Sequence, residues 1–488
     1  MKKILPLILT MFLSICLFAQ TQEQPQIFHK PITQSAAQQV ALMHVSSLSK
    51  NMHYTILTHR ELIHKSQSLA HVFDLLPIGY VVVSNSSLLP PVMAYSFESH
   101  FGEFDSNNPL FNLLCVDLSN RKFYVETEGL SYAEKNLQQW DTYNNEESLK
   151  GFYDRFEQWP DGMDGWLQTA WNQYAPYYNM CPMDPVTSVR SVAGCPSVAM
   201  ALILNFHKTT NNTRLDNGDD YYHNYAGRQY WIDDDFSTLD FPSFPQLNEY
   251  LDTLDAHFAT NTPLTNQDKA ALTFACGVAC TQVYTSSGSG TFGVNQAYSA
   301  YVRFGFLTIS LLDESDTDLY ERLQQNIKDT LPAHLAVVDS AWSMGHNVAV
   351  DGYNTNDYYH INFGWGGTYD GWYLLPDEIP YNLTVVEGLI VDITPPNYAG
   401  IFNDENKHQE ISAFPNPASH SVTISFHNPE HKNLTLSVYN SIGQLVYEAT
   451  NITDNEVYTD VSKLSGGVYF LKLSDGNVIL GQGKIVVE

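Results

Sequence analysis

Between Pro196 and Phe206 the chain carries no charged residue, and small or apolar side chains fall on every side of a 3.6-residue period. This pattern is typical of a helix that is buried all round rather than of an amphipathic surface helix. Proline fits the first turn of a helix, where its missing N–H costs nothing, so the helix is expected to start near Pro196. Cys195, preceded by Gly194, is therefore predicted at the N-terminus of a buried helix.

Upstream of this helix, residues 21 to about 140 have the pattern of a small α+β unit. A run with helical periodicity, Ser35 to Ser49, comes first, and strand-like runs follow at His71–Phe73, Gly79–Ser84, Leu113–Leu118 and Lys122–Glu126. A proline pair beginning at Pro90 interrupts the pattern, which then resumes as a strand. The polar, turn-rich stretch from Asp141 to Asp164 predicts a domain boundary and a site for proteolytic nicking.

The end of the chain has a different pattern. Residues 398–408 form a polar hinge, and short alternating runs separated by turns follow at Ser421–Phe426, Leu434–Tyr439, Leu445–Glu448 and Gly467–Leu473. Several short strands at close spacing predict a β-sandwich.

The start of the chain has the pattern of a secretory signal peptide. Lys2 and Lys3 provide the charged start, Ile4 to Phe18 the apolar run, and Ala19 a small residue near the cleavage point. The apolar run is too short for a comfortable transmembrane helix, and no later segment has the required length. We therefore expect an exported protein with no transmembrane segment after signal removal.

Composition adds bounds on domain number and partners. The chain has 488 residues, 44% of them hydrophobic, and a formal net charge of −29. This length predicts roughly two to four domains. The negative charge argues against nucleic acid and anionic membrane surfaces as partners.

Cysteine usage singles out one unpaired thiol. Cys16 leaves with the signal peptide, so an odd set remains: Cys115, Cys181, Cys195, Cys276 and Cys280. Cys276 and Cys280 lie four residues apart in a predicted helix, Lys269 to Val283, which suits two buried thiols better than a bridge. No cysteine pair or histidine cluster has zinc-site spacing, and the three acids from Asp233 suit a solvated loop better than a calcium site. We expect no metal and no cofactor.

The position of Cys195 favours nucleophilic chemistry, because the positive end of a helix dipole lowers a thiol pKa. A thiolate nucleophile needs a base, and the base needs an orienting group. His346 opens an apolar strand and Asn362 ends the next, so a hairpin can bring them side by side. Gln173 can join the Cys195 N–H in holding an oxyanion, and Trp365 can shield the histidine. The alternative is a free cysteine acting as a small core hydrophobe.

The order of these motifs resembles the streptopain-like secreted cysteine peptidases, which have a papain-like fold. The matching stretches are Gln173 with Pro176-Tyr177 and Asn179, Gly194-Cys195, Asn205-Phe206-His207, Gly345-His346, Asp351-Gly352-Tyr353, and Tyr359 to Asn362 followed by Gly364 to Gly367.

The resemblance implies roles for the site residues. Cys195 would be the nucleophile, His346 the general base and acid, Asn362 its orienting group, Gln173 the oxyanion donor and Trp365 the covering indole. Two positions depart from the family pattern: Phe363 stands where tryptophan is frequent, and Pro196 where a β-branched residue is common.

The glycine–serine loop from Thr285 to Gly290 looks like the family's loop at the border of the substrate cleft. Ser287 and Gly288, together with Gly345, are the predicted substrate-binding residues. A surface turn with no role is the alternative for this loop.

The flanking units also resemble parts of known proteins. The N-terminal unit resembles the propeptide of the same family. The C-terminal unit is similar to the type IX secretion sorting domains of Bacteroidetes at Phe414–Pro417, Ser441–Gly443, Leu464–Tyr469 and Gly483–Val486. An ordinary carbohydrate- or protein-binding sandwich is the alternative for this unit.

The expected fold class is therefore α+β, a papain-like cysteine peptidase domain preceded by a small α+β prodomain and followed by a small β-sandwich. The expected boundaries are a signal peptide at 1–20, the prodomain at 21–155, the catalytic domain at 156–396, a linker at 397–411 and the sorting domain at 412–488. We expect export through both membranes to the outside or the cell surface, with the type IX secretion machinery as a partner.

The predicted function is that of a secreted cysteine endopeptidase made as a zymogen. It would hydrolyse peptide bonds of proteins through a Cys-His-Asn site and an acyl-enzyme, with its own prodomain as inhibitor. One alternative is an amide hydrolase or acyl transferase acting on a small substrate. The other is a degenerate peptidase that serves as a surface binding protein.

Overall fold

The computed structural model describes residues 30–49, 52–105, 107–153, 156–162, 164–313, 315–338, 345–396, 411–426, 428, 431–440, 445–475 and 478–487. The chain divides into two compact units, Met1–Tyr398 and Ala399–Glu488. The predicted signal peptide, and the predicted linker up to residue 410, lie outside the described residues.

The first unit begins with an N-terminal region, defined here as the described residues between 30 and 153. Its elements are α1 (Gln34–Leu48), β1 (Thr55–His64), β2 (Gln67–Leu76), β3 (Tyr80–Ser84), β4 (Val92–Ser96), α2 (Pro109–Thr127), α3 (Leu130–Tyr143) and α4 (Glu146–Tyr153). The Thr33 side chain caps α1 by accepting a hydrogen bond from the Ala36 N–H. The predicted first helix and the strand after the proline pair are confirmed.

Two predicted strands in this region, Leu113–Leu118 and Lys122–Glu126, are wrong, because both stretches belong to α2. The Asn108 side chain caps this helix by accepting from the Phe111 N–H, and Pro109 occupies its first turn. The buried positions that follow recur at helical spacing, at Leu110, Leu113, Leu114, Leu118 and Val125. The start signals at residues 108 and 109 therefore outweigh the local resemblance to alternating strands.

The rest of the first unit is the peptidase region, residues 156–396. Its helices are α5 (Cys195–His207), α6 (Phe236–Leu239), α7 (Phe244–Ala259), α8 (Asn266–Ala279), α9 (Val294–Arg303), α10 (Leu319–Lys328) and a 3-10 turn, Tyr381–Leu383. Its strands are β5 (Gln158–Trp159), β6 (Tyr222–Tyr225), β7 (Arg228–Trp231), β8 (Ser310–Leu312), β9 (Ala333–Val338), β10 (Gly345–Asn354), β11 (Tyr358–Asn362), β12 (Gly371–Leu374) and β13 (Val386–Val391).

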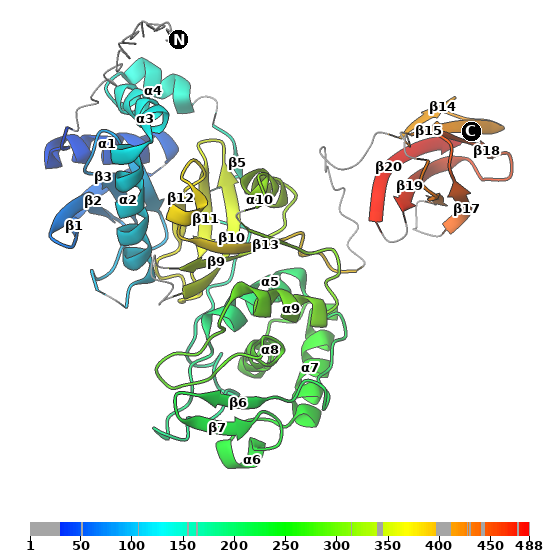
Figure 1. Cartoon of the computed structure of the whole chain (residues 1–488), viewed down its shortest axis with the longest axis horizontal. Coiled ribbons are helices and arrows are strands. Elements are labelled where there is room, and N and C mark those ends of the chain that lie inside the picture. Colours follow the sequence, from blue (N-terminus) through cyan, green and yellow to red (C-terminus); the bar gives the residue numbers. More distant parts are fainter. Residues whose placement is uncertain are drawn as a thin grey trace, which may run out of the picture. The chain divides into compact units, whose positions relative to one another are not determined.

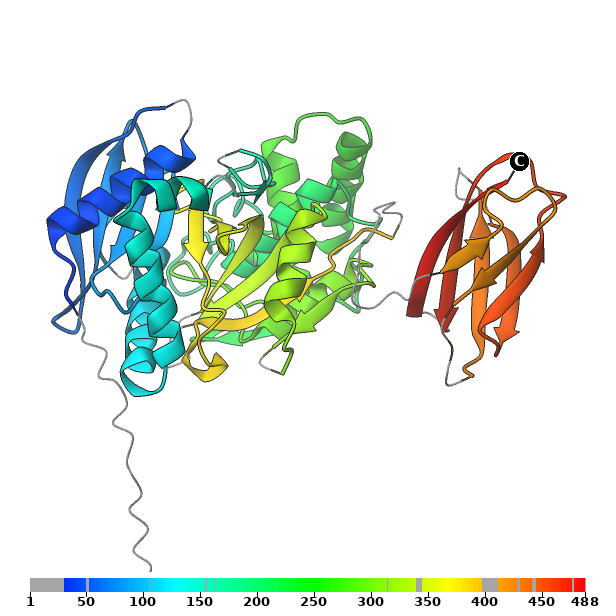
Figure 2. The ribbon, with the colours of Figure 1, turned by 90° about the horizontal axis from the view of Figure 1, so that it is seen from above.

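One sheet runs through both regions, in the order β1-β2-β3-β4-β12-β11-β10-β9-β13-β8 (Figures 1 and 2). The junction is the antiparallel pair β4–β12, where Tyr95 faces Trp372 and Ala94 faces Tyr373. Gly371 is needed at this junction, because a Cβ there would lie 2.7 Å from the Tyr95 carbonyl oxygen. The N-terminal region is therefore docked on the peptidase region by backbone pairing as well as by side chains.

A buried ion pair reinforces the junction. The Asp117 and Arg121 side chains of α2 pair at 2.9 Å and are almost completely inaccessible to solvent. Arg121 also donates to the Leu374 carbonyl oxygen at 2.7 Å, and the Tyr373 hydroxyl donates to Asp117. Both contacts reach β12, so α2 holds the strand that joins the two regions.

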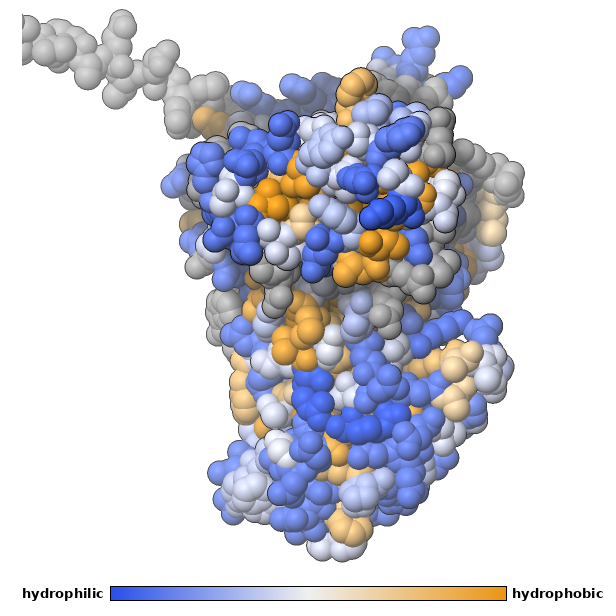
Figure 3. All heavy atoms as spheres, turned by 90° about the vertical axis from the view of Figure 1, so that its right-hand side faces the viewer, coloured by the Kyte–Doolittle hydropathy of each residue, from blue (hydrophilic) through white to orange (hydrophobic). Residues whose placement is uncertain are grey.

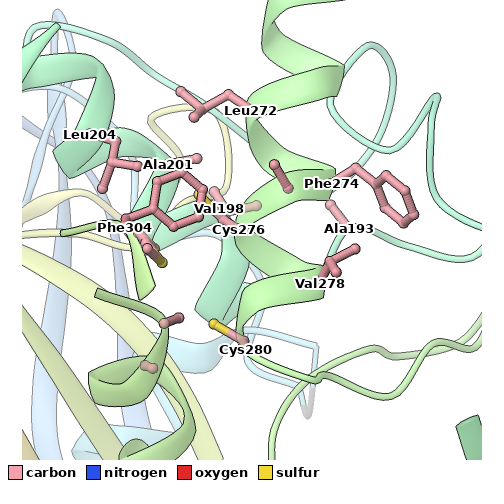
Figure 4. Close-up of a cluster of buried hydrophobic side chains, with 14 of the residues drawn as sticks. Ala193, Val198, Ala201, Leu204, Leu272, Phe274, Cys276, Val278, Cys280 and Phe304 are labelled. Atoms are coloured by element: carbon pink, nitrogen blue, oxygen red, sulfur yellow. The ribbon is translucent and has the colours of Figure 1, made fainter. Parts of the chain in front are cut away.

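Different cores cover the two faces of the peptidase half of the sheet. On one face α5 packs with α7, α8 and α9 against Ala336 and Ala349. Figure 4 shows side chains of α5 and α8 interleaved in this core. On the other face a core shared with the N-terminal region joins α2 and α10 to Val337, Val348 and Phe363.

The central helix prediction is confirmed, since every residue of α5 from Pro196 to Leu204 is buried. Cys276 lies in α8, and Cys280 directly follows that helix. Both are buried free thiols, also as predicted, and their sulfur atoms appear in yellow in Figure 4.

The second unit is a two-sheet structure with its own core, which confirms the predicted sandwich. One sheet has the order β14-β15-β18 and the other β17-β16-β19-β20. The strands are β14 (Ser412–Phe414), β15 (Ser421–Ser425), β16 (Leu434–Tyr439), β17 (Leu445–Ile452), β18 (Glu456–Asp460), β19 (Gly467–Asp475) and β20 (Val478–Val487). In Figure 3 the visible surface of the molecule is mostly hydrophilic, with isolated apolar patches. Within the described residues, no helix has both the length and the apolar character needed to cross a membrane.

Candidate active site

Cys195 is the first residue of α5, and Gly194 makes this position possible. Gly194 has a φ of +92°, and a Cβ there would lie 2.7 Å from the Gln282 side-chain oxygen. Only glycine adopts this conformation readily and fits this space. The chain therefore turns sharply into the helix and presents Cys195 at its N-terminus. Cys195 is partly exposed, whereas the other described cysteines are buried.

Burial raises the pKa of the Cys195 thiol above its ordinary value. Hydrogen bonds from the backbone and side-chain amides of Asn347 and from the Cys195 N–H favour the thiolate, while the charge of Glu387 disfavours it. The sequence-based expectation of a lowered thiol pKa is wrong for this form of the protein, because desolvation outweighs the donors at the helix start.

His346 lies on β10, one residue after the strand begins, and its ring contacts the segment that follows β11. Its Nε2 atom lies 3.0 Å from the Phe363 carbonyl oxygen and 3.3 Å from the Trp365 indole nitrogen. Burial lowers the pKa of His346 to about 4, so the ring is neutral. The shorter contact is to an acceptor, which identifies Nε2 as the protonated nitrogen and leaves Nδ1 as the basic one.

The predicted hairpin is present, with Ala349 of β10 facing Asn362 of β11. Successive side chains of a strand point to opposite faces of the sheet. Asn347 and Ala349 therefore face α5, whereas His346 faces the other way and stacks on the Phe363 ring at 6.0 Å between centroids. The hairpin brings the two strands together but separates the side chain of His346 from Cys195.

Asn362 does not orient His346 in this form. Its side-chain oxygen accepts from the Gly364 N–H at 3.0 Å, and its amide nitrogen lies 3.4 Å from the Thr169 carbonyl oxygen. Among the hydrogen bonds of the described residues, none joins His346 to Asn362 or to Cys195. The predicted triad is thus present in the sequence and adjacent in the fold, but it is not assembled.

The group next to the Cys195 sulfur is a residue that sequence reasoning missed. The Asn347 side-chain nitrogen lies 4.0 Å from Cys195 Sγ, and the Asn347 oxygen lies 2.7 Å from His334 Nε2. A signal was available, because both residues are polar interruptions in otherwise apolar strands. That the two side chains meet across the sheet could not be predicted without knowing the pairing register of their strands.

Gln173 lies beside the segment that leads to Cys195. Its carbonyl oxygen accepts from the Ala193 N–H at 3.0 Å. The residue is only 7% exposed. A side-chain amide beside the segment that leads to the nucleophile suits the predicted binding of an oxyanion.

The glycine–serine loop borders the same segment. The Val192 N–H donates to the Thr285 carbonyl oxygen at 3.1 Å, and the Ser289 carbonyl oxygen lies 3.1 Å from where a Gly194 Cβ would be. Ser287 and Gly288 donate backbone hydrogen bonds to the Thr285 hydroxyl. Ser287 and Gly288 therefore lie on a loop next to Cys195, and Gly345, the third predicted binding residue, is an exposed neighbour of His346.

The N-terminal region reaches the other side of the site through charged groups. Glu98 lies 2.8 Å from His360 Nε2, and Asp351 lies 2.7 Å from its Nδ1. Burial disfavours the charged ring, but the two carboxylates outweigh it and raise the pKa of His360 well above its ordinary value. His360 is therefore an imidazolium held between one carboxylate from each region.

A path of hydrogen bonds links the N-terminal region to the catalytic histidine candidate. The Ser96 hydroxyl donates to the Asp370 carbonyl oxygen at 2.7 Å, and the Asp370 carboxyl group accepts from the Phe363 N–H at 2.8 Å. Burial raises the pKa of Asp370 to about 8. Since His346 bonds to the Phe363 carbonyl, the docked N-terminal region and the position of His346 both depend on Phe363.

The described residues hold no group of three or more histidine, cysteine or acidic side chains arranged to bind a metal ion.

Comparison with known families matches the three parts of the chain separately. Residues 171–373 match the Peptidase C10 family. These residues form a Peptidase C10 family domain. Residues 29–121, which precede the C10 domain, match the Spi protease inhibitor family, and residues 412–488, which follow it, match the secretion system C-terminal sorting domain.

Two curated proteins are similar across the C10 domain and beyond it. Thiol protease/hemagglutinin PrtT of Porphyromonas gingivalis is 22% identical over 310 residues, which are 60% of this chain and 32% of PrtT. The chain thus spans about a third of the length of that relative. Streptopain of Streptococcus pyogenes serotype M28 (strain MGAS6180) is 22% identical over 326 residues, which are 64% of this chain and 74% of streptopain.

Solved structures include two forms of a similar protein. A mutant fragment of Prevotella intermedia prointerpain A is 21% identical with a TM-score of 0.47, covering 69% of this chain and 98% of the fragment. Active wild-type interpain A from the same organism is 21% identical with a TM-score of 0.35, covering 48% of this chain and 96% of its own.

The family and sequence matches confirm the predicted class. The chain combines a streptopain-like C10 cysteine peptidase domain with a preceding inhibitor-like prodomain and a secretion sorting domain. The predicted α+β fold class and the expected export to the outside or the cell surface are confirmed as well.

Proposed function

We propose that this chain is a secreted cysteine endopeptidase that is made as a zymogen and hydrolyses peptide bonds of protein substrates. The observation that carries the proposal is Cys195 at the start of the buried helix α5, beside a hairpin that holds His346 and Asn362. The proposed boundaries are those expected from the sequence: signal peptide 1–20, prodomain 21–155, catalytic domain 156–396, linker 397–411 and sorting domain 412–488.

We assign the described form to the latent state. In it His346 donates to the Phe363 carbonyl oxygen and faces away from Cys195, whose thiol pKa is raised by burial. The prodomain supports this arrangement through the path from Ser96 by way of Asp370 to Phe363. Removal of the prodomain also takes away Glu98 and the β4–β12 pairing, and the end of β10 is then free to rearrange.

Activation then requires the His346 side chain to move to the face of the sheet that carries Cys195. If the end of β10 at Gly345 and His346 leaves β9, the His346 ring can turn toward Cys195. The Nε2–H group then donates its hydrogen bond to the side-chain oxygen of Asn362 instead of to the Phe363 carbonyl oxygen. This exchange keeps the same tautomer, because Nε2 stays protonated and Nδ1 stays basic.

The reaction follows from the groups so assembled. His346 Nδ1 accepts the thiol proton, and the Cys195 sulfur attacks the carbonyl carbon of the scissile peptide. The Cys195 N–H and the Gln173 amide hold the oxyanion. The imidazolium then gives its proton to the leaving amine, and an acyl-enzyme remains. His346 next takes a proton from water, whose oxygen attacks the acyl carbon and releases the second product and the thiol.

The remaining residues have supporting roles in this proposal. Trp365 covers His346 with its indole ring. Ser287, Gly288 and Gly345 border the substrate. We assign the sorting domain to the type IX secretion machinery as its partner, with the prodomain as an inhibitor in the same chain.

The proposal is tested by cleavage of casein in reducing buffer and by labelling with a thiol-directed peptide epoxide. The wild type is expected to cleave casein and to carry the label on Cys195, while Cys195→Ala does neither. Labelling of Cys195 without cleavage of any protein would favour a hydrolase of small amides. Neither label nor cleavage would favour a degenerate peptidase that acts as a binding protein.

A further inference from the structure

The Cys195 sulfur has a polar neighbour that the reaction scheme above does not use. The Asn347 side-chain nitrogen lies 4.0 Å from Cys195 Sγ, and Asn347 is only 7% exposed. Its backbone and side-chain amides both stabilise the thiolate form of Cys195 against the effect of burial. In the latent state, therefore, Asn347 rather than His346 is the strand residue that acts on the sulfur.

A buried chain of hydrogen bonds extends behind Asn347. Its side-chain oxygen lies 2.7 Å from His334 Nε2, and His334 Nδ1 lies 3.2 Å from the Tyr301 hydroxyl. His334 and Tyr301 are both completely inaccessible to solvent. In the β9–β10 register Asn347 faces Ala336 and His334 faces Ala349, so the two polar side chains are diagonal neighbours on the face toward α5.

This chain fixes which end of the Asn347 amide faces the sulfur. Burial lowers the pKa of His334 to about 4, so its ring is neutral and carries one proton. If that proton were on Nδ1, the Tyr301 hydroxyl would accept from it, and the hydroxyl hydrogen would be left without an acceptor in an apolar core. With the proton on Nε2, Tyr301 donates to Nδ1 and His334 donates to the Asn347 oxygen.

The second arrangement satisfies every buried donor and is therefore favoured. It turns the oxygen of the Asn347 amide toward His334 and leaves its N–H groups for the sulfur.

We propose that Asn347 is a positioning residue for the nucleophile, which holds the Cys195 sulfur through its amide donors, and that His334 and Tyr301 set the orientation of that amide. The inference rests on the proposed function only in calling Cys195 the nucleophile. Among the described residues, the other titratable groups near the sulfur are Glu387 of β13 and Cys280 at the end of α8, and both act on it only through their charge. His346 does not contact it in this form.

The test is the pH dependence of Cys195 alkylation by iodoacetamide in the full chain from residue 21 to residue 488. Intact mass separates the alkylated full chain from any trimmed product, and peptide mapping assigns the modified cysteine. The other described cysteines are at most 2% exposed, so brief labelling reports on Cys195. Alkylation needs no turnover, so the test remains valid if the wild type proves unable to cleave casein.

Asn347→Leu keeps the side-chain shape and removes the donors. The midpoint of the rate–pH curve is expected to rise by about one pH unit, which is roughly a tenfold slower reaction below the midpoint. His334→Leu should move the midpoint in the same direction although His334 does not touch the sulfur, because the Asn347 amide is then free to turn. His334→Gln keeps a donor toward Asn347 and should stay near the wild type.

Thr273→Val is the matched control, since it removes an equally buried hydroxyl in the same core that bonds only to the carbonyl of Lys269 in its own helix. It should leave the midpoint unchanged. A midpoint in Asn347→Leu equal to that of the wild type would overturn the proposal. If Asn347→Leu does not fold, the His334 pair decides: equal midpoints for His334→Leu and His334→Gln would contradict it.

Discussion

The two faces of the sheet at β10 hold different parts of the proposed catalytic site. The face toward α5 carries Asn347, whose side-chain nitrogen lies 4.0 Å from Cys195 Sγ, and Asn362, which pairs with Ala349. The opposite face carries His346, stacked on Phe363 and in contact with Trp365. The sequence predicts His346 beside the Cys195 sulfur, whereas the structure places the next residue, Asn347, there.

The two faces also differ in what covers them. Helices of the peptidase region bury the α5 face, whereas the core on the His346 face is shared with the N-terminal region. A zymogen built in this way needs no inhibitor side chain at the nucleophile. In the proposed zymogen, latency arises because the N-terminal region, which is removed on activation, stabilises the face on which the proposed base is held. The predictions below test this difference between the faces.

The largest effect is expected from His346→Ala. Peptide hydrolysis by the mature enzyme should fall by about 10²- to 10⁴-fold, because the general base and acid is lost. In the latent chain the same substitution should leave the rate of Cys195 alkylation nearly unchanged, because His346 does not contact the sulfur there. Parallel kinetics and alkylation measure both quantities, and an equally large loss in the latent chain would place His346 beside Cys195 before activation.

The next effect is expected at the junction of the two regions. Gly371→Ala places a Cβ 2.7 Å from the Tyr95 carbonyl oxygen, which should weaken the β4–β12 pairing by about 1–3 kcal/mol. The prodomain should then be released faster, as intact mass over time would report, and the thermal unfolding midpoint of a Cys195→Ala background should fall. Unchanged release would show that this pairing does not control latency.

A smaller, pH-dependent effect is expected from Glu98→Gln. Glu98 stabilises the charged form of His360, whose pKa is raised in the folded chain. The stabilisation of the folded chain by the charged His360 is fully present below the ordinary histidine pKa of about 6.5. It is lost as the pH rises through the raised pKa of His360 in the folded chain. Stability of the docked form should fall by about 1 kcal/mol at pH 6, and the difference should shrink toward alkaline pH.

Thermal unfolding in a Cys195→Ala background at several pH values measures this difference. Lys135→Gln is the matched control, because it breaks the exposed pair with Glu378 at the same junction. Exposed pairs contribute little, so its effect should be below about 0.5 kcal/mol at every pH. A constant effect of Glu98→Gln across the pH range would contradict the role of the charged His360.

The smallest effect is expected from Trp365→Phe, which keeps an aromatic cover over His346 but removes the indole N–H that lies 3.3 Å from Nε2. Because Nε2 keeps its proton toward the Phe363 or Asn362 oxygen, the indole N–H is only a polar neighbour of the ring, and its loss should lower kcat/KM by about two- to fivefold. Steady-state kinetics on a peptide substrate measure it. A loss as large as that of His346→Ala would mean that the indole, and not the Phe363 or Asn362 oxygen, orients the base.

The helices and strands that carry the site could be predicted from the sequence, but the arrangement of their side chains could not. The buried helix after Cys195, the hairpin of His346 and Asn362, and the final sandwich follow from local periodicity and turn residues. The face of the sheet to which the His346 side chain points does not follow from local pattern. It depends on the register between β9 and β10, which is set by packing on both sides of the sheet. The same register pairs Asn347 with His334, two residues that look like chance interruptions of apolar strands.

Two further features could not be read from local pattern. The pairing of β4 with β12 joins segments that are far apart in sequence, and the sequence of neither strand indicates which strand it pairs with. Residues 113–126 alternate well enough to suggest strands, yet the cap at Asn108 and the buried pair of Asp117 and Arg121 hold them in a helix. Long-range contacts and start signals outweighed local propensity in both cases.

The most direct test of the central claim is the intact mass over time of purified residues 21–488, wild type and Cys195→Ala in parallel. The account predicts that the wild type removes its prodomain between Tyr153 and Trp166, whereas Cys195→Ala stays intact until a trace of mature wild type is added. If both chains trim themselves alike, Cys195 is not the nucleophile. If neither changes and casein also survives in reducing buffer, the chain is not a peptidase zymogen.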